Sequence, residues 1–298
     1  MVDDDDEVIP IDLKTLQQRL FSSFEKRRRP SDSSDRRWTL PDLLKSNQDG
    51  LSHVPIEILA KCVIPVLEGL RSIDAESLLE LERAHQGAVL DEGVAIKPVH
   101  QLVKPACPDD TVRYVHLSDV PGQYSMGIFI FPPHAKIPLH DHPGMCVLSR
   151  VLYGSLQRLS LDLARDDDNS ESEGDEDFPW SMLWTATKAP EKRKLPMGTK
   201  RAYKHHVDHL QAPSCSALYP YEGNLHEFEA GPDGAAVLDV LFPPYDEPDR
   251  DCTFYNIVET TDQTSGSSDQ QPCLIVPTGQ PEDFHCISGR YLSLGSTD

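Results

Sequence analysis

The spacing of hydrophobic residues along the chain changes near residue 97. Before that point, apolar side chains recur every three or four residues, a period that is typical of amphipathic helices. Beyond it, short apolar runs alternate with Pro and Gly, as in a protein built from short strands. The pattern therefore predicts a helical N-terminal region over residues 1–92, with a partly disordered start, and a β-rich domain over residues 93–298. Helices are expected at residues 11–25, 39–44, 55–71 and 75–86.

The apolar runs of the second part of the chain are separated by turn residues at short intervals. Many short strands in this arrangement indicate a sandwich or barrel of the jelly-roll type. The polar stretch 260–271 predicts a loop, and the strand-like tail 274–293 could close an edge of the sheet. The other expected strands are residues 111–117, 124–131, 137–140, 146–153, 155–163, 181–186, 216–219, 225–229 and 235–241.

Residues 166–177 form an acidic, low-complexity run within the β-rich domain. Because such a composition cannot bury enough apolar surface to fold, we expect a disordered insertion. A calcium site is the alternative interpretation, but the run lacks the ligand spacing of an EF-hand loop. The stretch 188–211 is likewise expected to be an enlarged loop.

Composition limits the classes of function. Lys and Arg number 28 against 49 Asp and Glu, so the formal net charge is −21 and nucleic-acid binding is not expected. No apolar run reaches the length of about 18 residues that would suggest a membrane helix, and the acidic start Met1–Glu7 does not resemble a signal peptide. Seven cysteines without a C-x-x-C pair favour reduced thiols in the cytoplasm or nucleus. We expect a monomer.

Two histidines separated by one residue, His140 and His142, form the strongest chemical signal. On an extended segment they point to the same face, and a neighbouring strand could add His226. Imidazole suits Fe, Zn, Cu and Ni, so this triad predicts a metal site without choosing the metal. The general cupin pattern would place a carboxylate four or five residues after His142, where Cys146 and Val147 stand. The sequence thus predicts three histidine ligands and no carboxylate.

Other candidate residues have competing interpretations. His205 and His209 could bind zinc on one helix face, but no Glu follows His205, and we expect surface residues in a loop. Asp239 stands between Leu238 and Val240 in an apolar strand, where burial is unfavourable without a partner. That partner could be a substrate ammonium or a structural arginine. The thiols of Cys146 and Cys252 are expected to be buried as small hydrophobic groups.

Several motifs then follow in a fixed order, and together they resemble one family. The chain is similar, over about residues 97–258, to the thiol dioxygenases that comprise the plant cysteine oxidases and 2-aminoethanethiol (cysteamine) dioxygenase. The resemblance implies a cupin-type jelly-roll barrel binding Fe(II), with His140, His142 and His226 as ligands and with Asp239 and Tyr245 near the substrate. The motifs are Ile137–Met145, Leu152–Leu156, Gly223–His226, Leu238–Tyr245 and Asp251–Tyr255.

The implied reaction adds both atoms of O2 to a thiol and yields a sulfinic acid. Its substrate would be the N-terminal cysteine of proteins or peptides, so that the product marks an N-degron and the enzyme senses oxygen and hypoxia. A small-thiol dioxygenase acting on cysteamine or free cysteine is the alternative, and a non-catalytic cupin binding module is another. One departure concerns Phe254, which stands where the animal enzyme has a tyrosine two residues after its cysteine. A thioether crosslink through Cys252 is therefore in question, and the nearest phenol is Tyr255.

Overall fold

In the computed structural model, two helices precede the barrel. α2 (Leu40–Ser46) and α3 (Ile56–Arg71) confirm the helices expected at 39–44 and 55–71. The helices expected at 11–25 and 75–86, the strand at 181–186 and the acidic run 166–177 lie outside the described residues. The proposed boundary between residues 92 and 93 lies there too. The structure describes residues 40–47, 49–73, 88–91, 97–98, 111–164, 196–246, 248–260 and 271–292.

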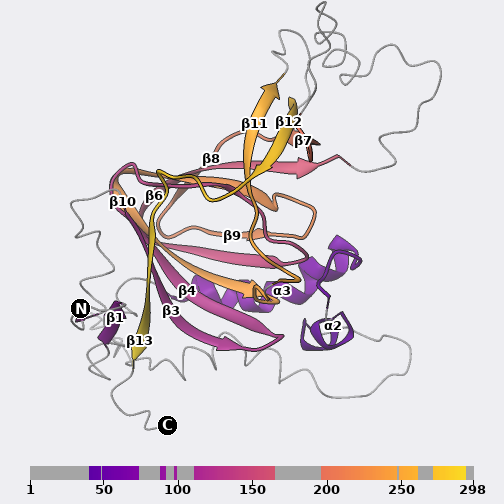
Figure 1. Cartoon of the computed structure of the whole chain (residues 1–298). Helices are drawn as coiled ribbons and strands as arrows, with labels where there is room; N and C mark the ends of the chain where they lie inside the picture. Colours follow the sequence, from indigo (N-terminus) through magenta and orange to yellow (C-terminus); the bar gives the residue numbers. More distant parts are fainter. Residues whose placement is uncertain are drawn as a thin grey trace, which may run out of the picture.

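α3 shows why this region is helical. Its buried residues are spaced by three or four positions and form one apolar face, whereas Ile64 on another face is 46% exposed. This face packs against β6 (Cys146–Leu163) and β9 (Cys215–Leu218) (Figure 1). Its residues share one hydrophobic cluster with Met126, Cys146 and Val240 of the barrel. The N-terminal helices and the barrel therefore have a common core. The buried residues of α3 are Leu59, Cys62, Val63, Val66 and Leu70.

The segment between the two helices also contacts two barrel turns. The Leu51 N–H donates to the Gly144 carbonyl at 2.6 Å, in the turn that follows His142. The Tyr221 hydroxyl, in the turn before His226, donates to the Val54 carbonyl at 2.6 Å. One short segment is therefore bonded to both turns that flank the histidines.

The barrel closes through β10, which pairs with β4, β5 and β6. The path β10–β5–β11–β12–β7–β6 returns to β10 and forms a ring (Figure 1). The predicted cupin-type jelly-roll barrel with a helical region before it is confirmed. The strands are β1 (Ala88–Asp91), β2 (Lys97–Pro98), β3 (Val112–Val120), β4 (Tyr124–Phe131), β5 (Lys136–His140), β6 (Cys146–Leu163), β7 (Lys200–Lys204), β8 (Asp208–Gln211), β9 (Cys215–Leu218), β10 (Leu225–Phe242), β11 (Phe254–Thr260), β12 (Gln271–Thr278) and β13 (Cys286–Leu292).

Two predictions about the strands were wrong in detail. The runs 146–153 and 155–163 form one long strand, β6, and the runs 225–229 and 235–241 form another, β10. Gly154 and Gly234, which suggested turns, instead lie where the hydrogen-bonded register between β6 and β10 is irregular. The loop expected over 188–211 contains β7 and β8, which have little apolar pattern and are held by pairing with β6 and β12.

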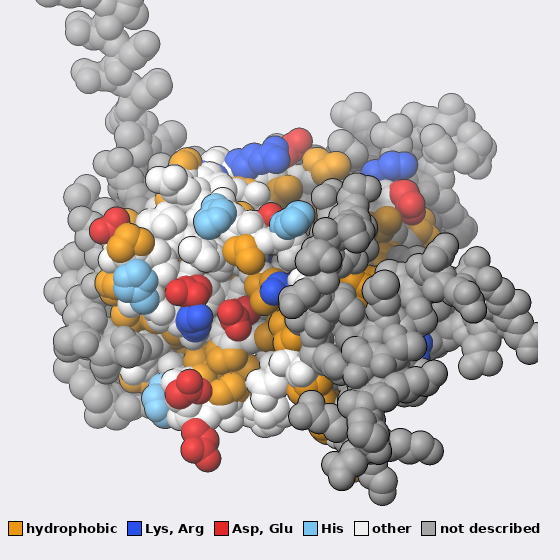
Figure 2. Space-filling model, turned by 90° about the horizontal axis from the view of Figure 1, so that it is seen from above, with side chains coloured by type: hydrophobic (Ala, Val, Ile, Leu, Met, Phe, Trp, Pro, Cys, Tyr) orange, Lys and Arg blue, Asp and Glu red, His pale blue; other side chains and the backbone are white. Residues whose placement is uncertain are grey.

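The surface of the described part mixes charges of both signs. Figure 2 shows Lys and Arg, Asp and Glu, and His side chains interspersed with hydrophobic ones on one face. Within the described ranges, none of the helices is both long and apolar enough to cross a membrane. The six cysteines in those ranges are free thiols.

Gly154 offers a test of the contact between β6 and β10. Its φ is +66°, and a Cβ at this position would meet the backbone of Gly234. Gly122 has a similar φ of +67°, but a Cβ there would meet nothing within 4 Å. Gly122→Ala should therefore carry only backbone strain of about 1 kcal/mol. Gly154→Ala should lower the free energy of unfolding by about 2–3 kcal/mol more, as measured by urea denaturation. Equal losses would show that the two strands accommodate a side chain.

Candidate metal centre and substrate pocket

The structure brings the three predicted histidines together. His140 is the last residue of β5 and His226 is the second residue of β10, and the two residues are paired in the sheet register. His142 follows two residues after His140, and one ligand atom from each ring lies within 4.8 Å of the others. The residues are only 8%, 6% and 2% exposed, in the order 140, 142 and 226. This is the single such cluster of possible metal ligands in the part of the chain that the structure describes.

Asp141 points away from the cluster, as the strand alternation predicted. Its Oδ1 accepts the Thr253 N–H at 2.9 Å, and its Oδ2 accepts the Tyr255 hydroxyl at 2.9 Å. The Asp141 N–H in turn donates to the Thr253 carbonyl at 3.1 Å. Burial raises the pKa of Asp141, and the hydrogen bonds from Thr253 and Tyr255 oppose that rise. Asp141 therefore anchors the segment between the two histidines and is not a ligand.

Hydrogen bonds at the Nδ1 atoms orient all three rings. His140 Nδ1 lies 2.9 Å from the Pro138 carbonyl, and His226 Nδ1 lies 3.3 Å from the Asn224 carbonyl. His142 Nδ1 lies 2.7 Å from the Tyr245 hydroxyl, which itself donates to the Asp141 carbonyl at 3.0 Å. A carbonyl can only accept, and the phenol proton is used, so each Nδ1 carries a hydrogen. The Nε2 lone pairs remain for a metal ion, an arrangement common at histidine metal sites.

Burial also keeps the three imidazoles neutral. It lowers the pKa of His140 to about 4, against the opposing effect of hydrogen bonds to the Pro138 and His226 backbone. It lowers the pKa of His142 and of His226 well below the usual value, and the neighbouring imidazoles act in the same direction. Neutral imidazole is the form that binds a metal. Three neutral nitrogen donors fit Fe(II), Zn, Cu or Ni.

Asn224 is a site residue to which sequence analysis assigned no role. Its Oδ1 accepts the His142 N–H at 2.9 Å, and its Nδ2 donates to the His142 carbonyl at 2.8 Å. Its own backbone carbonyl is the one that orients His226. Asn224 thus joins two ligands that are 84 positions apart, as their numbers show. The position of Asn224 in the motif that precedes His226 could have marked it as a site residue. Its hydrogen bonds to His142 can be seen only in the folded structure.

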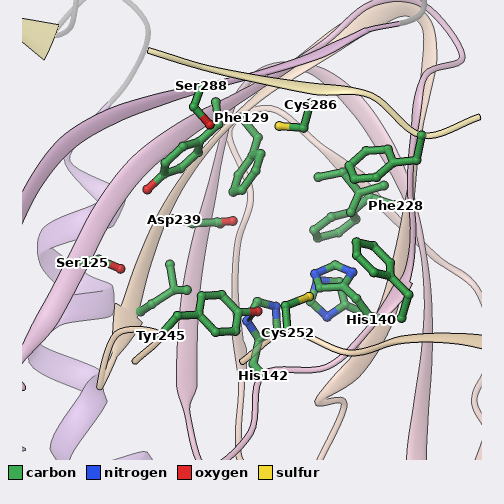
Figure 3. Close-up of a pocket in the computed structure, with 16 residues that line it drawn as sticks. Ser125, Phe129, His140, His142, Phe228, Asp239, Tyr245, Cys252, Cys286 and Ser288 are labelled. Atoms are coloured by element: carbon green, nitrogen blue, oxygen red, sulfur yellow. Dashed lines mark hydrogen bonds between the residues drawn. The ribbon is translucent and has the colours of Figure 1, made fainter. Parts of the chain in front are cut away.

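A cavity of about 270 Å³ opens from the three histidines (Figure 3). One side is polar, with Tyr114, Ser125, Asp239 and Tyr245 among its residues. Another side is apolar and is formed by Ile137, Phe228, Phe254 and Phe284, which belong to one hydrophobic cluster. The pocket beside the three histidines therefore has one side with polar side chains and another side with apolar side chains.

Asp239 points into this pocket (Figure 3) although it is only 6% exposed. It pairs in register with Gly127 of β4 and Ser149 of β6. Burial raises its pKa to about 7, and a hydrogen bond with the Ser149 side chain opposes this rise. Its Oδ1 has no hydrogen-bond partner among the described residues, and no salt bridge with an arginine is found there. Sequence analysis considered a structural arginine and a substrate ammonium as partners of Asp239. Among the described residues, no arginine forms a salt bridge with it.

Of the other residues considered from the sequence, Tyr245 and Cys252 line the pocket, whereas Cys146 and Tyr255 lie outside it. Tyr245 lines the pocket, and burial raises its pKa well above 10, so its hydroxyl stays protonated. Cys252 also lines the pocket and is half-buried beside Tyr245, which differs from the buried apolar role expected for it. Cys146 is buried in the core, as expected. Tyr255 is committed to Asp141 on the other side of the segment.

His205 and His209 do not form the alternative zinc site in the described structure. His205 lies between β7 and β8, and its Nε2 is 2.9 Å from Asp162 Oδ2. His209 lies on β8 and is exposed. The helix that the zinc interpretation needed is absent from residues 196–246. His209 is a surface residue, as expected, whereas His205 is half-buried, and the expected loop is partly strand.

The family model and the curated relatives that match this chain agree with each other. The family model described as PCO_ADO matches residues 86–293. The 2-aminoethanethiol dioxygenase of Homo sapiens is 30% identical over 207 residues, which cover 67% of this chain and 74% of that protein. Plant cysteine oxidase 1 of Arabidopsis thaliana is 34% identical over 173 residues, or 55% of this chain and 50% of that protein. A solved RmlC-like cupin protein from Desulfovibrio desulfuricans is 14% identical, with a TM-score of 0.29 over 49% of this chain and 95% of that one.

Tyr245→Phe tests the hydrogen bond at His142. The ring can stay in place, but His142 Nδ1 loses the oxygen that accepts its hydrogen. We expect Co(II) affinity, measured by competition with a chelator, to fall by about 10- to 100-fold while the apoprotein stays folded. Tyr153→Phe removes a phenol outside the pocket and serves as the control. Unchanged Co(II) affinity in Tyr245→Phe would show that this phenol does not orient the ligand.

Proposed function

Because the chain belongs to the family of plant cysteine oxidases and 2-aminoethanethiol dioxygenases, we propose that it is an Fe(II)-dependent thiol dioxygenase acting on N-terminal cysteine of proteins or peptides. The observation that carries this proposal is the buried Asp239 carboxylate in the same pocket as three neutral imidazoles. An N-terminal cysteine carries a thiol and an ammonium group two carbon atoms apart. The pocket offers a separate place for each group.

His140, His142 and His226 would hold the Fe(II) ion, whose remaining coordination positions would supply the site where a thiolate and O2 react. The reaction RSH + O2 → RSO2H transfers both oxygen atoms to sulfur and needs no external reductant. The chain's own residues position the reactants. Asp239 would receive the substrate ammonium, and Tyr245 and Asn224 would fix the rings of the ligands. The apolar wall would exclude water from the reacting sulfur.

Two features favour a peptide over a small thiol. A cavity of about 270 Å³ has room for more than the side chain of one cysteine, and it includes exposed residues, Cys286 and Ser288, on its border. A net charge of −21 favours encounters with basic peptides, and this attraction weakens with added salt. Cysteamine or free cysteine remains the alternative substrate, since either can present a thiol and an amine to the same groups.

The proposed product has a consequence for the cell. Cysteine sulfinic acid is not readily reduced, so oxidation would be a lasting mark on a protein N-terminus. Formation of this mark depends on O2, and we infer a role in oxygen sensing through an N-degron, with stabilisation of the substrate in hypoxia. The cytoplasm or nucleus would be the place of action, in agreement with the free thiols of the described cysteines.

The direct test incubates the full chain, loaded with Fe(II), with four thiols in air. They are a Cys-initiating peptide with Arg or Lys downstream, its N-acetylated form, cysteamine and free cysteine. We expect a gain of two oxygen atoms by mass spectrometry, with higher kcat/KM for the free peptide than for cysteamine. The acetylated peptide should not turn over, because acetylation removes the positive charge that Asp239 would bind. Preferential oxidation of cysteamine would move the assignment to the small-thiol alternative.

The His226→Ala variant is the control for the metal in this experiment. It should lose most bound iron and all turnover while the barrel stays folded. Full iron content and turnover in this variant would contradict the ligand assignment. Wild-type protein that binds no iron and oxidises none of the thiols would support the non-catalytic binding module instead.

Asp239→Asn separates a substrate anchor from a structural residue. We expect the variant to keep its iron but to show a KM for the Cys-initiating peptide at least tenfold higher. In the wild-type enzyme, KM should fall as pH rises from 6 to 7.5, because Asp239 ionises with a pKa of about 7 and only the carboxylate pairs with the ammonium. That part of the pH dependence should be absent from the variant.

Stability gives the matching control for Asp239→Asn. Burial raises the pKa of Asp239 from 3.8 to about 7, so the native state binds this proton more tightly than the unfolded state does. The carboxyl group therefore stabilises the fold least at high pH, and its contribution is lost as pH rises from about 4 to 7. At pH 8 the Asn variant should melt at the same or a higher temperature than the wild type. A large loss of stability would identify Asp239 as structural.

A further inference from the structure

The outer border of the pocket is formed by the chain that joins β12 to β13. Residues 279–285 leave β12 and enter β13, which crosses the pocket on the side away from His142 (Figures 1 and 3). Phe284 of this segment and Cys286 and Ser288 of β13 line the pocket. Its conformation is fixed by backbone bonds, because the Phe284 N–H donates to the Pro281 carbonyl at 3.1 Å and the Val112 N–H donates to the His285 carbonyl at 3.1 Å.

Phe284 is well placed to contact a substrate. It is nearly buried, and its ring centroid lies 5.8 Å from that of Phe254, which in turn lies 6.1 Å from His140. The two phenylalanines thus form a continuous apolar path that begins at the candidate metal ligand and ends at the border of the pocket. The mechanism above uses these two rings only to exclude water from the reacting sulfur and assigns them no contact with the rest of the substrate.

The geometry of an N-terminal cysteine indicates what this path receives. Its α-carbon carries the thiol-bearing carbon, the amine and the carbonyl carbon of the next peptide bond. If the thiol is directed to the histidines and the amine to Asp239, the carbonyl and the following residue must leave toward the outer border. That border carries the exposed Cys286 and Ser288 and the ring of Phe284. The apolar surface available there to the following side chain is the path formed by Phe284 and Phe254.

We propose that Phe284 is a specificity-determining residue that selects an apolar side chain directly after the N-terminal cysteine. This inference rests on the proposed function and names the substrate class more closely. An apolar side chain at the second position removes surface of its own and of Phe254 and Phe284 from water. An acidic side chain gains nothing there and meets the like charge of the exposed Glu282 and Asp283, which precede Phe284 in the chain. Hydrophobic pockets of this kind discriminate by roughly 10- to 200-fold.

The test uses the Fe(II)-loaded full chain and peptides that differ only in their second residue, namely Cys-Leu, Cys-Gly and Cys-Asp. We expect wild-type kcat/KM to be about tenfold higher for Cys-Leu than for Cys-Gly, mostly through KM, and lowest for Cys-Asp. Phe284→Ala should reduce the ratio of Cys-Leu to Cys-Gly to below threefold. Ile287→Ala is the matched control, because Ile287 lies three residues after Phe284, is exposed and lies outside the pocket lining, and it should leave the ratio unchanged.

A binding measurement keeps this inference separate from the proposed function. Ser-Leu and Ser-Gly peptides, which lack the thiol, are titrated into the same proteins by calorimetry. Tighter binding of Ser-Leu in the wild type, lost in Phe284→Ala and retained in Ile287→Ala, supports the inference even if no thiol is oxidised. If Phe284→Ala does not fold, Phe284→Trp fills the same space and should weaken Ser-Leu more than Ser-Gly. Equal affinity and equal kcat/KM for the Leu and Gly peptides in the wild type would overturn the inference.

Discussion

Three imidazole rings can share one small buried volume only while they remain neutral and correctly turned. Within 4.8 Å of one another, two protonated rings would repel strongly, and burial already disfavours the charged form. A misdirected ring would present an N–H where a lone pair is needed. Much of the surrounding structure meets these two conditions. Pro138, Asn224 and Tyr245 set the tautomers, and the barrel removes the rings from water.

β10 carries both a candidate metal ligand and the residue proposed to bind the substrate ammonium. Its first half carries His226 and pairs with β5, while its second half carries Asp239 and pairs with β4. β6 runs alongside both halves and sets their register through the irregular point between Ala230 and Ala235. A single strand therefore fixes the separation between His226 and the Asp239 carboxylate. A one-residue slip of either half would turn its functional side chain to the other face.

The sequence predicted the parts of this site that depend on local spacing. The alternation of a strand was enough to place His140 and His142 together and Asp141 apart, and an isolated charge in an apolar run was enough to single out Asp239. The partners across the barrel could not be predicted in the same way. The bond between Asn224 and His142 and the approach of Phe284 to Phe254 join residues far apart in the chain. β7 and β8 were missed because pairing, and not an apolar pattern, holds them in place.

The segment between α2 and α3 has a mechanical consequence. Leu51 and Val54 are bonded to the turns that follow His142 and precede His226, so this segment is attached to both sides of the triad. Any ligand that displaces it would act on two of the three metal-binding nitrogens at once. Thermodynamic linkage then requires the reverse effect, in which occupation of the metal site changes the affinity of that ligand by the same factor. A shortened chain that begins after α3 would lack this brace, although it would retain every histidine of the site.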